Sequence, residues 1–311
     1  MEFYMSMEVF SAIFLVAIAA VPIGVLISLR RPNWGITHVY KASTRARLPI
    51  TSDEMWWSIR RRSRNETRAS MWGLLIAVAI VGTLFAFTQL KSSPYFIWIL
   101  VLMIFVVTAV TSTLASTRER LFSPAPQAAR IARARELDVS DYLSSVRQYT
   151  PRVLLIAAGV AFTVLCLSAF WKEISIPVIA GSAASLALAL VATWICRVAE
   201  QQILACPQPA TNTLELGWDD LFRTDSLNNL RMVAAMTAWL PFGIALTALT
   251  NAWIFRGQTD LEQFAGLFPW WGIPLLQVMY VLGAGRLSPA LFPEYLNSPQ
   301  ADLSVPKEIA K

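Results

Sequence analysis

The chain has 311 residues, of which 56% are hydrophobic and 15% are charged, and its mean hydropathy is +0.51. A soluble globular chain carries roughly a quarter charged residues, so this composition excludes a soluble protein. The net charge of +6 does not predict nucleic-acid binding, because the basic residues lie directly beside apolar runs, where anionic lipid headgroups attract them. The expected partner is therefore the bilayer, with its anionic cytoplasmic headgroups.

Seven apolar runs are each long enough for a transmembrane helix, which needs about 20 apolar residues. They predict spans at residues 9–29, 71–90, 95–116, 153–171, 176–196, 232–254 and 269–285. Proline and glycine crowd the start of the last one, at Pro269, Gly272 and Pro274. The predicted fold class is an all-α integral membrane protein of about seven spans, with residues 1–311 forming a single polytopic domain.

The first run resembles a signal peptide in length but not in its flanks. Two Glu and no basic residue precede it, and Arg30 and Arg31 follow it. A cleaved signal peptide has a basic start, so we expect a retained anchor helix whose N-terminus is outside.

The distribution of Lys and Arg predicts the orientation of the remaining spans. Residues 30–70 hold ten, 117–152 hold seven, 197–231 hold three and the tail 286–311 holds three, against only Lys91, Lys172 and Arg256 on the other side. Basic residues near span ends stay in the cytoplasm, so the long loops and the C-terminus are predicted to be cytoplasmic. The spans then form one anchor helix and three hairpins with short outer turns.

A related pattern precedes each hairpin and predicts a short amphipathic cytoplasmic helix there. Before the second hairpin, Asp141 is followed eleven residues later by Arg152, and before the third, Asp220 is followed at the same distance by Arg231. The first copy, with Asp53, matches loosely. Acidic residues suit the start of a helix and Arg suits its end beside the headgroups.

Two interpretations of these segments remain open: a solvated elbow helix that sets the geometry of the hairpin, or a docking site for a partner or for lipid. Tryptophan among arginines is typical of a helix lying in the membrane interface. The candidate docking or lipid contacts are Trp56, Trp57, Arg60, Arg61, Arg62, Arg64, Asp141, Arg152, Trp218, Asp219, Asp220 and Arg231.

The interiors of the seven predicted spans contain no Asp, Glu, Lys, Arg or His. An ionisable residue inside a span would indicate a pump, a transporter or an intramembrane enzyme. The candidate intramembrane polar or packing residues are Gly181, Ser185, Asn251 and Gln277. Gly181 and Ser185 have the four-residue spacing that lets helices approach closely, whereas the two amides could bond across helices or contribute to a solute site.

Motifs for phosphate, dinucleotide or zinc binding and for nucleophilic serine catalysis are absent from the sequence. The chain has one histidine, His38, and three cysteines without metal-type spacing. We therefore predict no catalytic residue, no cofactor and no metal site.

The stretches Arg47-Leu48-Pro49-Ile50-Thr51 and Leu216-Gly217-Trp218-Asp219-Asp220 resemble those of a group of polytopic membrane proteins common in actinobacteria, which has no assigned activity. The resemblance implies a bacterial plasma membrane and supplies no catalytic residues.

Three hypotheses on function follow from the sequence. The first is a non-catalytic membrane component, such as a partner subunit of a membrane complex. The second is a permease for a small or apolar solute, and the third is a lipid-modifying enzyme that uses Asp219 and Asp220 at the cytoplasmic interface.

Overall fold

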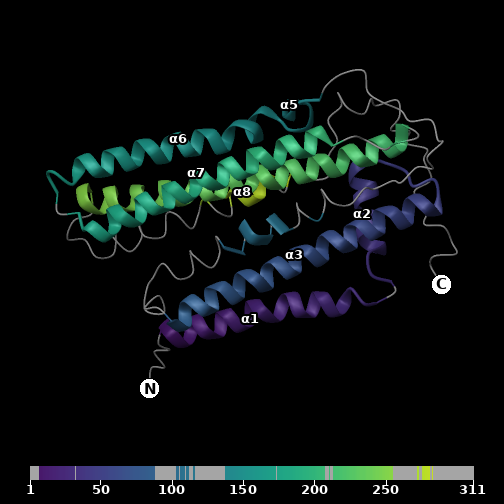
Figure 1. Cartoon of the computed structure of the whole chain (residues 1–311), viewed down its shortest axis with the longest axis horizontal. Coiled ribbons are helices and arrows are strands. Elements are labelled where there is room, and N and C mark those ends of the chain that lie inside the picture. The colour runs from purple at the N-terminus through teal and green to yellow at the C-terminus, as the bar shows by residue number, and fades with distance from the viewer. Residues whose placement is uncertain are drawn as a thin grey trace. The chain divides into compact units, whose positions relative to one another are not determined.

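The protein is described by a computed structural model in which all regular secondary structure of the described residues is helical (Figure 1). The structure describes residues 7–31, 33–87, 137–172, 174–206, 210, 213–254 and 275–280, with shorter pieces at 103–104, 106–108, 110–111, 115, 272 and 282. The predicted all-α class is confirmed for this part of the chain.

Backbone contacts divide the chain into two compact units. Unit 1 comprises Met1–Arg135, Pro207–Phe222 and Gly285–Lys311, and unit 2 comprises Glu136–Cys206 and Arg223–Ala284. Each unit is thus assembled from segments that are distant in the sequence.

Four helices are long and apolar enough to cross a membrane, and they coincide with four of the predicted spans: α3 (Asp53–Phe87), α6 (Ser145–Ser168), α7 (Ile176–Ala205) and α8 (Thr213–Trp253). On α6, exposed large apolar side chains recur every three or four residues, at Val153, Ile156, Val160, Val164 and Leu167. Such a continuous apolar face is unfavourable in water and suits lipid. The protein is therefore membrane-embedded.

The remaining predicted spans are described only in part. The first coincides with α1 (Met7–Ser28), whose described apolar stretch, Leu15–Ser28, is shorter than a full span. The spans predicted at 95–116 and 269–285 lie largely outside the described residues, as do the outer turns beside them. The number of seven, the hairpin arrangement and the orientation stay predictions.

In unit 1, α1 packs along α3 (Figure 1). Leu15 of α1 and Val81 of α3 are both buried at this contact. Further along α3, a Cβ at Gly73 would collide with the side chain of Thr111 and would lie 3.0 Å from the carbonyl oxygen of Val107. Glycine is therefore required at position 73, where Val107 and Thr111 lie against α3.

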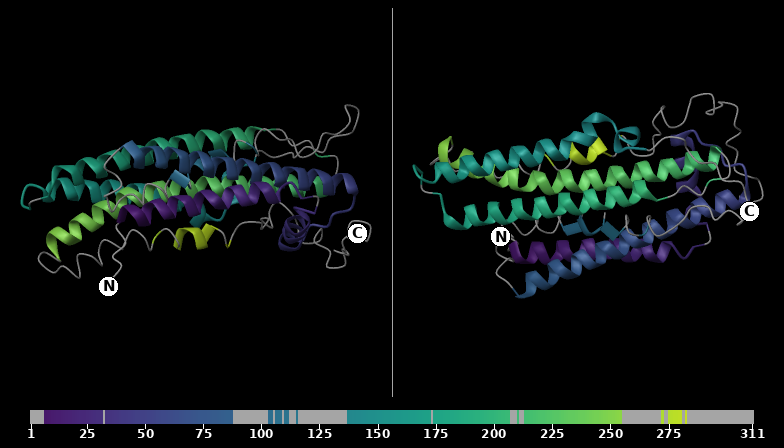
Figure 2. Two further views of the ribbon diagram at one scale, coloured as in Figure 1. Left: turned by 90° about the horizontal axis from the view of Figure 1, so that it is seen from below. Right: turned by 45° about the horizontal axis from the view of Figure 1, so that its top comes forward.

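In unit 2, α6, α7 and the part of α8 that begins at Arg223 lie side by side in all views (Figures 1 and 2). A short connection joins α6 to α7, and the two helices pack against each other. Near that connection, the indole Nε1 of Trp253 donates a hydrogen bond to Ser168 Oγ, at 3.2 Å. The ammonium of Lys172 lies 4.7 Å from the centroid of the same indole ring.

The short cytoplasmic helices predicted before the hairpins are observed only once. Before α6, α5 (Val139–Tyr142) is a single turn, in which the backbone N–H of Asp138 donates to Asp141 Oδ2 at 2.9 Å. The other two predicted helices are instead the first turns of α3 and α8, which run without a break into their apolar parts. No proline interrupts either helix where a separate elbow was predicted, so the helical hydrogen bonds continue.

Candidate functional site

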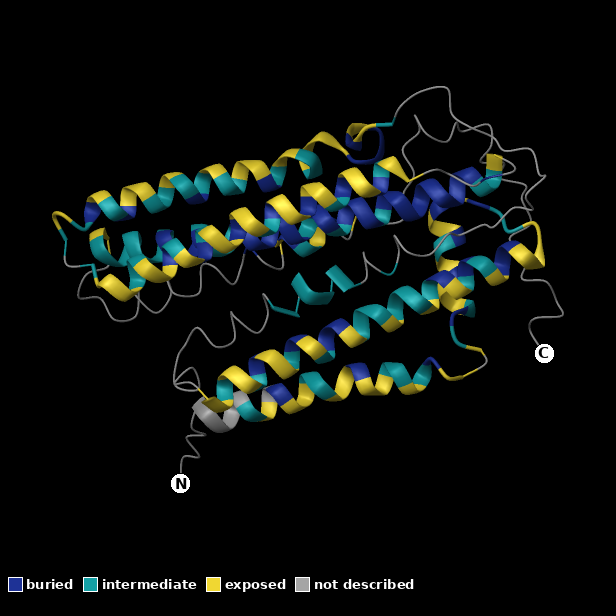
Figure 3. Cartoon of the chain, in the orientation of Figure 1, coloured by how far each residue is buried: buried dark blue, intermediate teal, exposed yellow. Residues whose placement is uncertain are grey.

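The apolar core of unit 1 joins α2 (Ile36–Ala46) and the first turns of α3 to the first turns of α8, which lie more than 150 residues further along the chain. This core consists of the buried side chains of Val39, Ala46, Leu48, Met55, Trp56, Ile59, Trp218, Leu221 and Phe222. Several of them belong to the predicted docking segments, so these segments meet in space and bury much of their apolar surface against one another (Figure 3).

Trp218 is the largest fully buried side chain of this core. Its indole Nε1 donates a hydrogen bond to the carbonyl oxygen of Pro49 at 3.3 Å, and the adjacent Leu48 is also fully buried. The stretches 47–51 and 216–220 are therefore in contact with each other. Buried indoles usually find such a partner, because an unpaired N–H is costly.

Two residues in the left-handed backbone conformation bracket α2. Gly35 precedes the helix with φ 90° and Arg47 follows it with φ 55°. Just after Arg47, the hydroxyl of Ser43 donates to the carbonyl oxygen of Leu48 at 2.6 Å, and the N–H of Leu48 donates to the carbonyl of Ser43 at 3.1 Å. This reciprocal pair turns the chain so that Leu48 enters the core.

The predicted tryptophan and arginine cluster of α3 is divided between the core and the surface. Trp56 and Arg62 are 5% and 6% exposed, whereas Trp57 is 59% exposed. The Arg60 guanidinium lies 5.0 Å from the Trp56 ring centroid and 5.1 Å from that of Trp57, and its Nε donates to the carbonyl of Trp34 at 2.9 Å. The Arg62 guanidinium lies 4.5 Å from the Phe222 ring.

The outward-facing members of the cluster are Trp57, Arg61 and Arg64, all of them exposed. They are the predicted docking or lipid contacts of α3 that are accessible to a partner.

The predicted acidic residues are buried rather than displayed. Asp219 is 6% exposed, Asp220 is fully buried, and both have contacts within the protein. Asp141 is 9% exposed and accepts the hydrogen bond from the N–H of Asp138. Arg152, eleven residues after Asp141 in the repeated pattern, is exposed.

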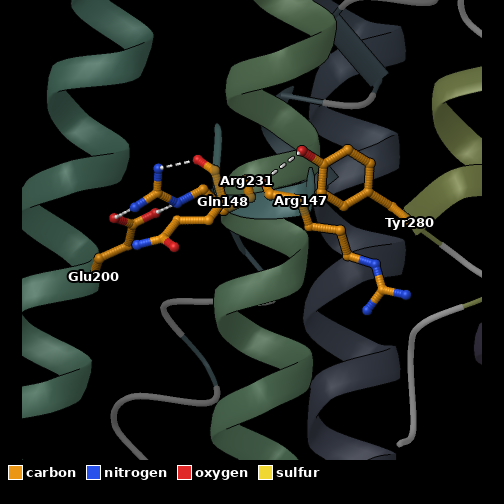
Figure 4. Close-up of polar contacts among 5 residues, drawn as sticks. All are labelled: Arg147, Gln148, Glu200, Arg231 and Tyr280. Atoms are coloured by element: carbon orange, nitrogen blue, oxygen red, sulfur yellow. Dashed lines mark hydrogen bonds and ion pairs between the residues drawn. The ribbon is translucent and has the colours of Figure 1, made fainter. Parts of the chain in front are cut away.

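Arg231 occupies the centre of a polar contact in unit 2 that we call the helix clamp: Arg231 of α8, Glu200 of α7 and the backbone carbonyl of Gln148 in α6 (Figure 4). Its Nε lies 2.6 Å from Glu200 Oε1, and its Nη2 donates to Oε2 at 2.7 Å. Nη1 donates to the Gln148 carbonyl at 3.1 Å. Both charged side chains are 6% exposed, so this is a buried bidentate ion pair.

Four further hydrogen bonds join segments of unit 2. The hydroxyl of Tyr280 donates to the carbonyl of Arg147 at 3.1 Å (Figure 4), and the Asn228 amide donates to the carbonyl of Tyr280 at the same distance. Arg223 donates to the carbonyls of Ile203 and Cys206, at 3.0 Å and 2.7 Å. It thereby satisfies backbone acceptors at the end of α7, where helices leave carbonyls unpaired.

Glu200 is the residue of the helix clamp that the sequence patterns did not predict. The predicted span ended at residue 196 and placed Glu200 in a cytoplasmic loop, whereas α7 continues to Ala205. The signal was present, because the buried residues of α7 recur every three or four positions: Ser182, Ser185, Ala189, Thr193, Cys196, Glu200 and Ile203. Extending this face by one turn identifies Glu200 as a buried position.

The intramembrane candidates do not come together as one site in the described residues. Ser185 is buried on the packed face of α7, whereas Gly181 is exposed and a Cβ there would contact nothing within 4 Å. Asn251 and Gln277 are partly buried, and Asn251 Oδ1 is a buried atom with no hydrogen-bond partner in this part of the chain. The small residue that faces the packed side in place of Gly181 is Ser182.

Among the described residues, no three His, Cys, Asp or Glu side chains gather in a way that could hold a metal ion. The three cysteines are unpaired with one another, and Cys196 is buried one turn before Glu200.

Comparison with known proteins gave no match: no protein-family model, no curated protein and no solved structure matches the chain.

Proposed function

We propose that this chain is a multi-pass protein of the bacterial plasma membrane that serves as a non-catalytic component or partner subunit of a membrane complex. In the proposed arrangement seven spans cross the bilayer, the N-terminus is outside and the C-terminus is cytoplasmic. The resemblance to the actinobacterial membrane proteins belongs to this proposal.

The observation that supports this proposal is that the buried polar side chains of both units bind other groups of the protein. Glu200 and Arg231 neutralise each other at 6% exposure, and the indole N–H of Trp218 is satisfied inside an apolar core. Groups held in this way stabilise helix packing and are not presented to a substrate. Exposed aromatic and basic side chains, such as Trp57 and Arg64, are of the kinds that favour partner binding.

Purification from native membranes tests this function. The tagged chain, expressed at its natural level, is extracted in mild detergent and separated by size. We expect it to elute with a second membrane protein at a constant molar ratio, and overexpression to produce an excess of the free chain. Elution of the chain alone at every expression level would contradict the proposal.

A permease for a small or apolar solute is the second candidate, and one observation favours it. In the described part of α8, two buried amide oxygens, Asn228 Oδ1 and Asn251 Oδ1, have no hydrogen-bond partner, and Pro241 lies between them. Buried polar atoms without a partner are consistent with a solute path.

Thiol labelling of Asn251→Cys, in a chain whose Cys166, Cys196 and Cys206 are replaced by Ser, tests the permease. A membrane-impermeant reagent would label a path open to water from one side. Labelling no faster than that of an Ile156→Cys control on the exposed face of α6 would exclude such a path at Asn251.

A further inference from the structure

A stripe of exposed aromatic and basic side chains runs along the first half of α3. It consists of Trp57, Arg61, Arg64, Arg68 and Trp72, and we call it the α3 stripe. All five residues are exposed, the two tryptophans at 59% and 51%. Spacings of three and four residues place them on one face of the helix, within about 80° of arc.

The opposite face of the same turns packs into the apolar core of unit 1 through Met55, Ile59 and Arg62. The stripe therefore faces away from that core. Asp53 and Glu54 precede it, and the next carboxylate of α3 is that of Glu66. Glu66 is two positions from both Arg64 and Arg68, which places it roughly 200° around the helix from each. Arg61 also has an interaction within the protein, whereas Arg64 and Arg68 lie on the face of α3 opposite to Glu66.

Because α3 is one continuous helix, the distance of each stripe residue from the membrane end of the helix indicates whether it lies among the lipid headgroups or in water. The predicted span begins at residue 71, so Trp72 marks the membrane end of the stripe. At 1.5 Å per residue, Arg68 lies about 6 Å, Arg64 about 12 Å and Trp57 about 22 Å further along the helix axis. The headgroup layer adds only about 5–8 Å to each side of the hydrocarbon core. A helix that stands upright in the membrane therefore carries Arg64 and Trp57 beyond the lipid headgroups.

We propose that the α3 stripe is the docking face for a cytoplasmic protein segment that presents acidic side chains. Arginine binds carboxylates through paired hydrogen bonds, and the exposed Trp57 supplies an aromatic anchor of the kind that dominates binding energy at interfaces. Arg64 and Arg68 place two positive charges on this face, which an acidic segment complements. This inference rests on the proposed function and orientation and identifies the surface through which the partner binds.

Photo-crosslinking in living cells tests the stripe. Trp57 of the full-length chain is replaced by a photo-reactive aromatic residue, and the adduct is mapped by mass spectrometry. We expect one protein adduct whose contact peptide is rich in Asp and Glu. The triple charge reversal Arg61/Arg64/Arg68→Glu should reduce the adduct by at least ten-fold. Lysine substitutions in the mapped acidic peptide should restore it.

The matched control reverses three other exposed basic residues, Lys41, Arg45 and Arg47, and so changes the net charge equally. It should leave the adduct unchanged. If the triple variant of the stripe fails to accumulate in membranes, Arg64→Glu alone is used, with at least a three-fold loss expected.

Three results would overturn the inference: adducts with lipid only, a contact peptide without acidic residues, or an adduct that survives charge reversal of the stripe. A partner that copurifies at a constant ratio but gives no adduct from position 57 would remove this docking face and leave the proposed function intact. Absence of any partner would remove both.

Discussion

The apolar core of unit 1 and the helix clamp of unit 2 hold distant segments together by different means. The core joins α2, α3 and α8 through side chains such as Leu48 and Trp218, and its stability derives from apolar burial. The clamp joins α6, α7 and α8 through one guanidinium, one carboxylate and one backbone carbonyl. Burial is non-directional, whereas a bidentate ion pair fixes geometry.

The apolar core and the helix clamp are therefore expected to lose stability in different ways when their residues are substituted. When a side chain in an apolar core is truncated, the loss of stability grows with the volume of the cavity, because the neighbouring side chains fill that cavity only in part. An ion pair responds to the loss of one partner far more than to the loss of both, because a single buried charge remains uncompensated.

The largest effect is expected from Arg231→Met, which leaves Glu200 buried without its partner. We expect a loss of roughly 3–5 kcal/mol of stability, measured by thermal unfolding in detergent. The double variant Glu200→Gln/Arg231→Met should recover most of that loss, because no buried charge remains. As a control, replacing the exposed Arg152 by Met should change stability by less than about 0.5 kcal/mol. An equal loss in the single and double variants would show that the clamp is no directional ion pair.

The next effect compares two neighbouring tryptophans of α3. Trp56→Ala should destabilise unit 1 by about 3 kcal/mol, because it opens a cavity in the apolar core. Trp57→Ala, at the adjacent exposed position, should stay within about 0.5 kcal/mol of the wild type. Limited proteolysis of the loop between α2 and α3, followed over time, would report both. Equal cleavage rates in the two variants would contradict the assignment of Trp56 to the core.

A smaller effect separates the polar part of the core from its apolar part. Trp218→Phe keeps an aromatic ring in place but removes the N–H that bonds to the carbonyl of Pro49. The expected loss is about 1 kcal/mol by thermal unfolding. Unchanged stability would mean that apolar burial alone holds these two segments together.

The smallest effect concerns the left-handed residue after α2. Arg47→Gly should raise stability by about 0.5–1 kcal/mol, since glycine adopts positive φ without the steric cost that a side chain imposes. Lys41→Gly, an exposed position inside the same helix, should lower it by about 1 kcal/mol. The two variants would be compared in one thermal-unfolding series, and a loss in both would indicate that the backbone at Arg47 is not under strain.

The apolar runs were sufficient to predict the four long membrane helices, because length and hydropathy directly determine what can span a bilayer. They did not predict where those helices end. The charged residues around Arg60 and Arg64 predicted a separate surface helix, yet the helical propensity of a segment does not depend on where its polarity changes. The same error moved Glu200 out of α7 and concealed its pairing with Arg231.

The sequence predicted that Trp56 and Trp218 lie in the segments that precede the hairpins. It did not predict that these two segments contact each other. Their contact joins residues more than 150 positions apart, and only tertiary packing establishes it. Local spacing on one helix could identify the exposed stripe of α3 once its buried side was known. The pairing of Glu200 on α7 with Arg231 on α8 has no such local pattern, because the two residues lie on different helices.

The helix clamp also affects the order in which the protein can be assembled. Glu200 leaves the ribosome 31 residues before Arg231, so its carboxylate exists for a time without its cation. At synthesis rates of about 5–20 residues per second, this interval is on the order of seconds. During this interval, the C-terminal end of α7 cannot be fixed in its final packing. A chain truncated before α8 would therefore carry an unpaired acid at the membrane, a feature by which cellular quality control could recognise an unfinished copy.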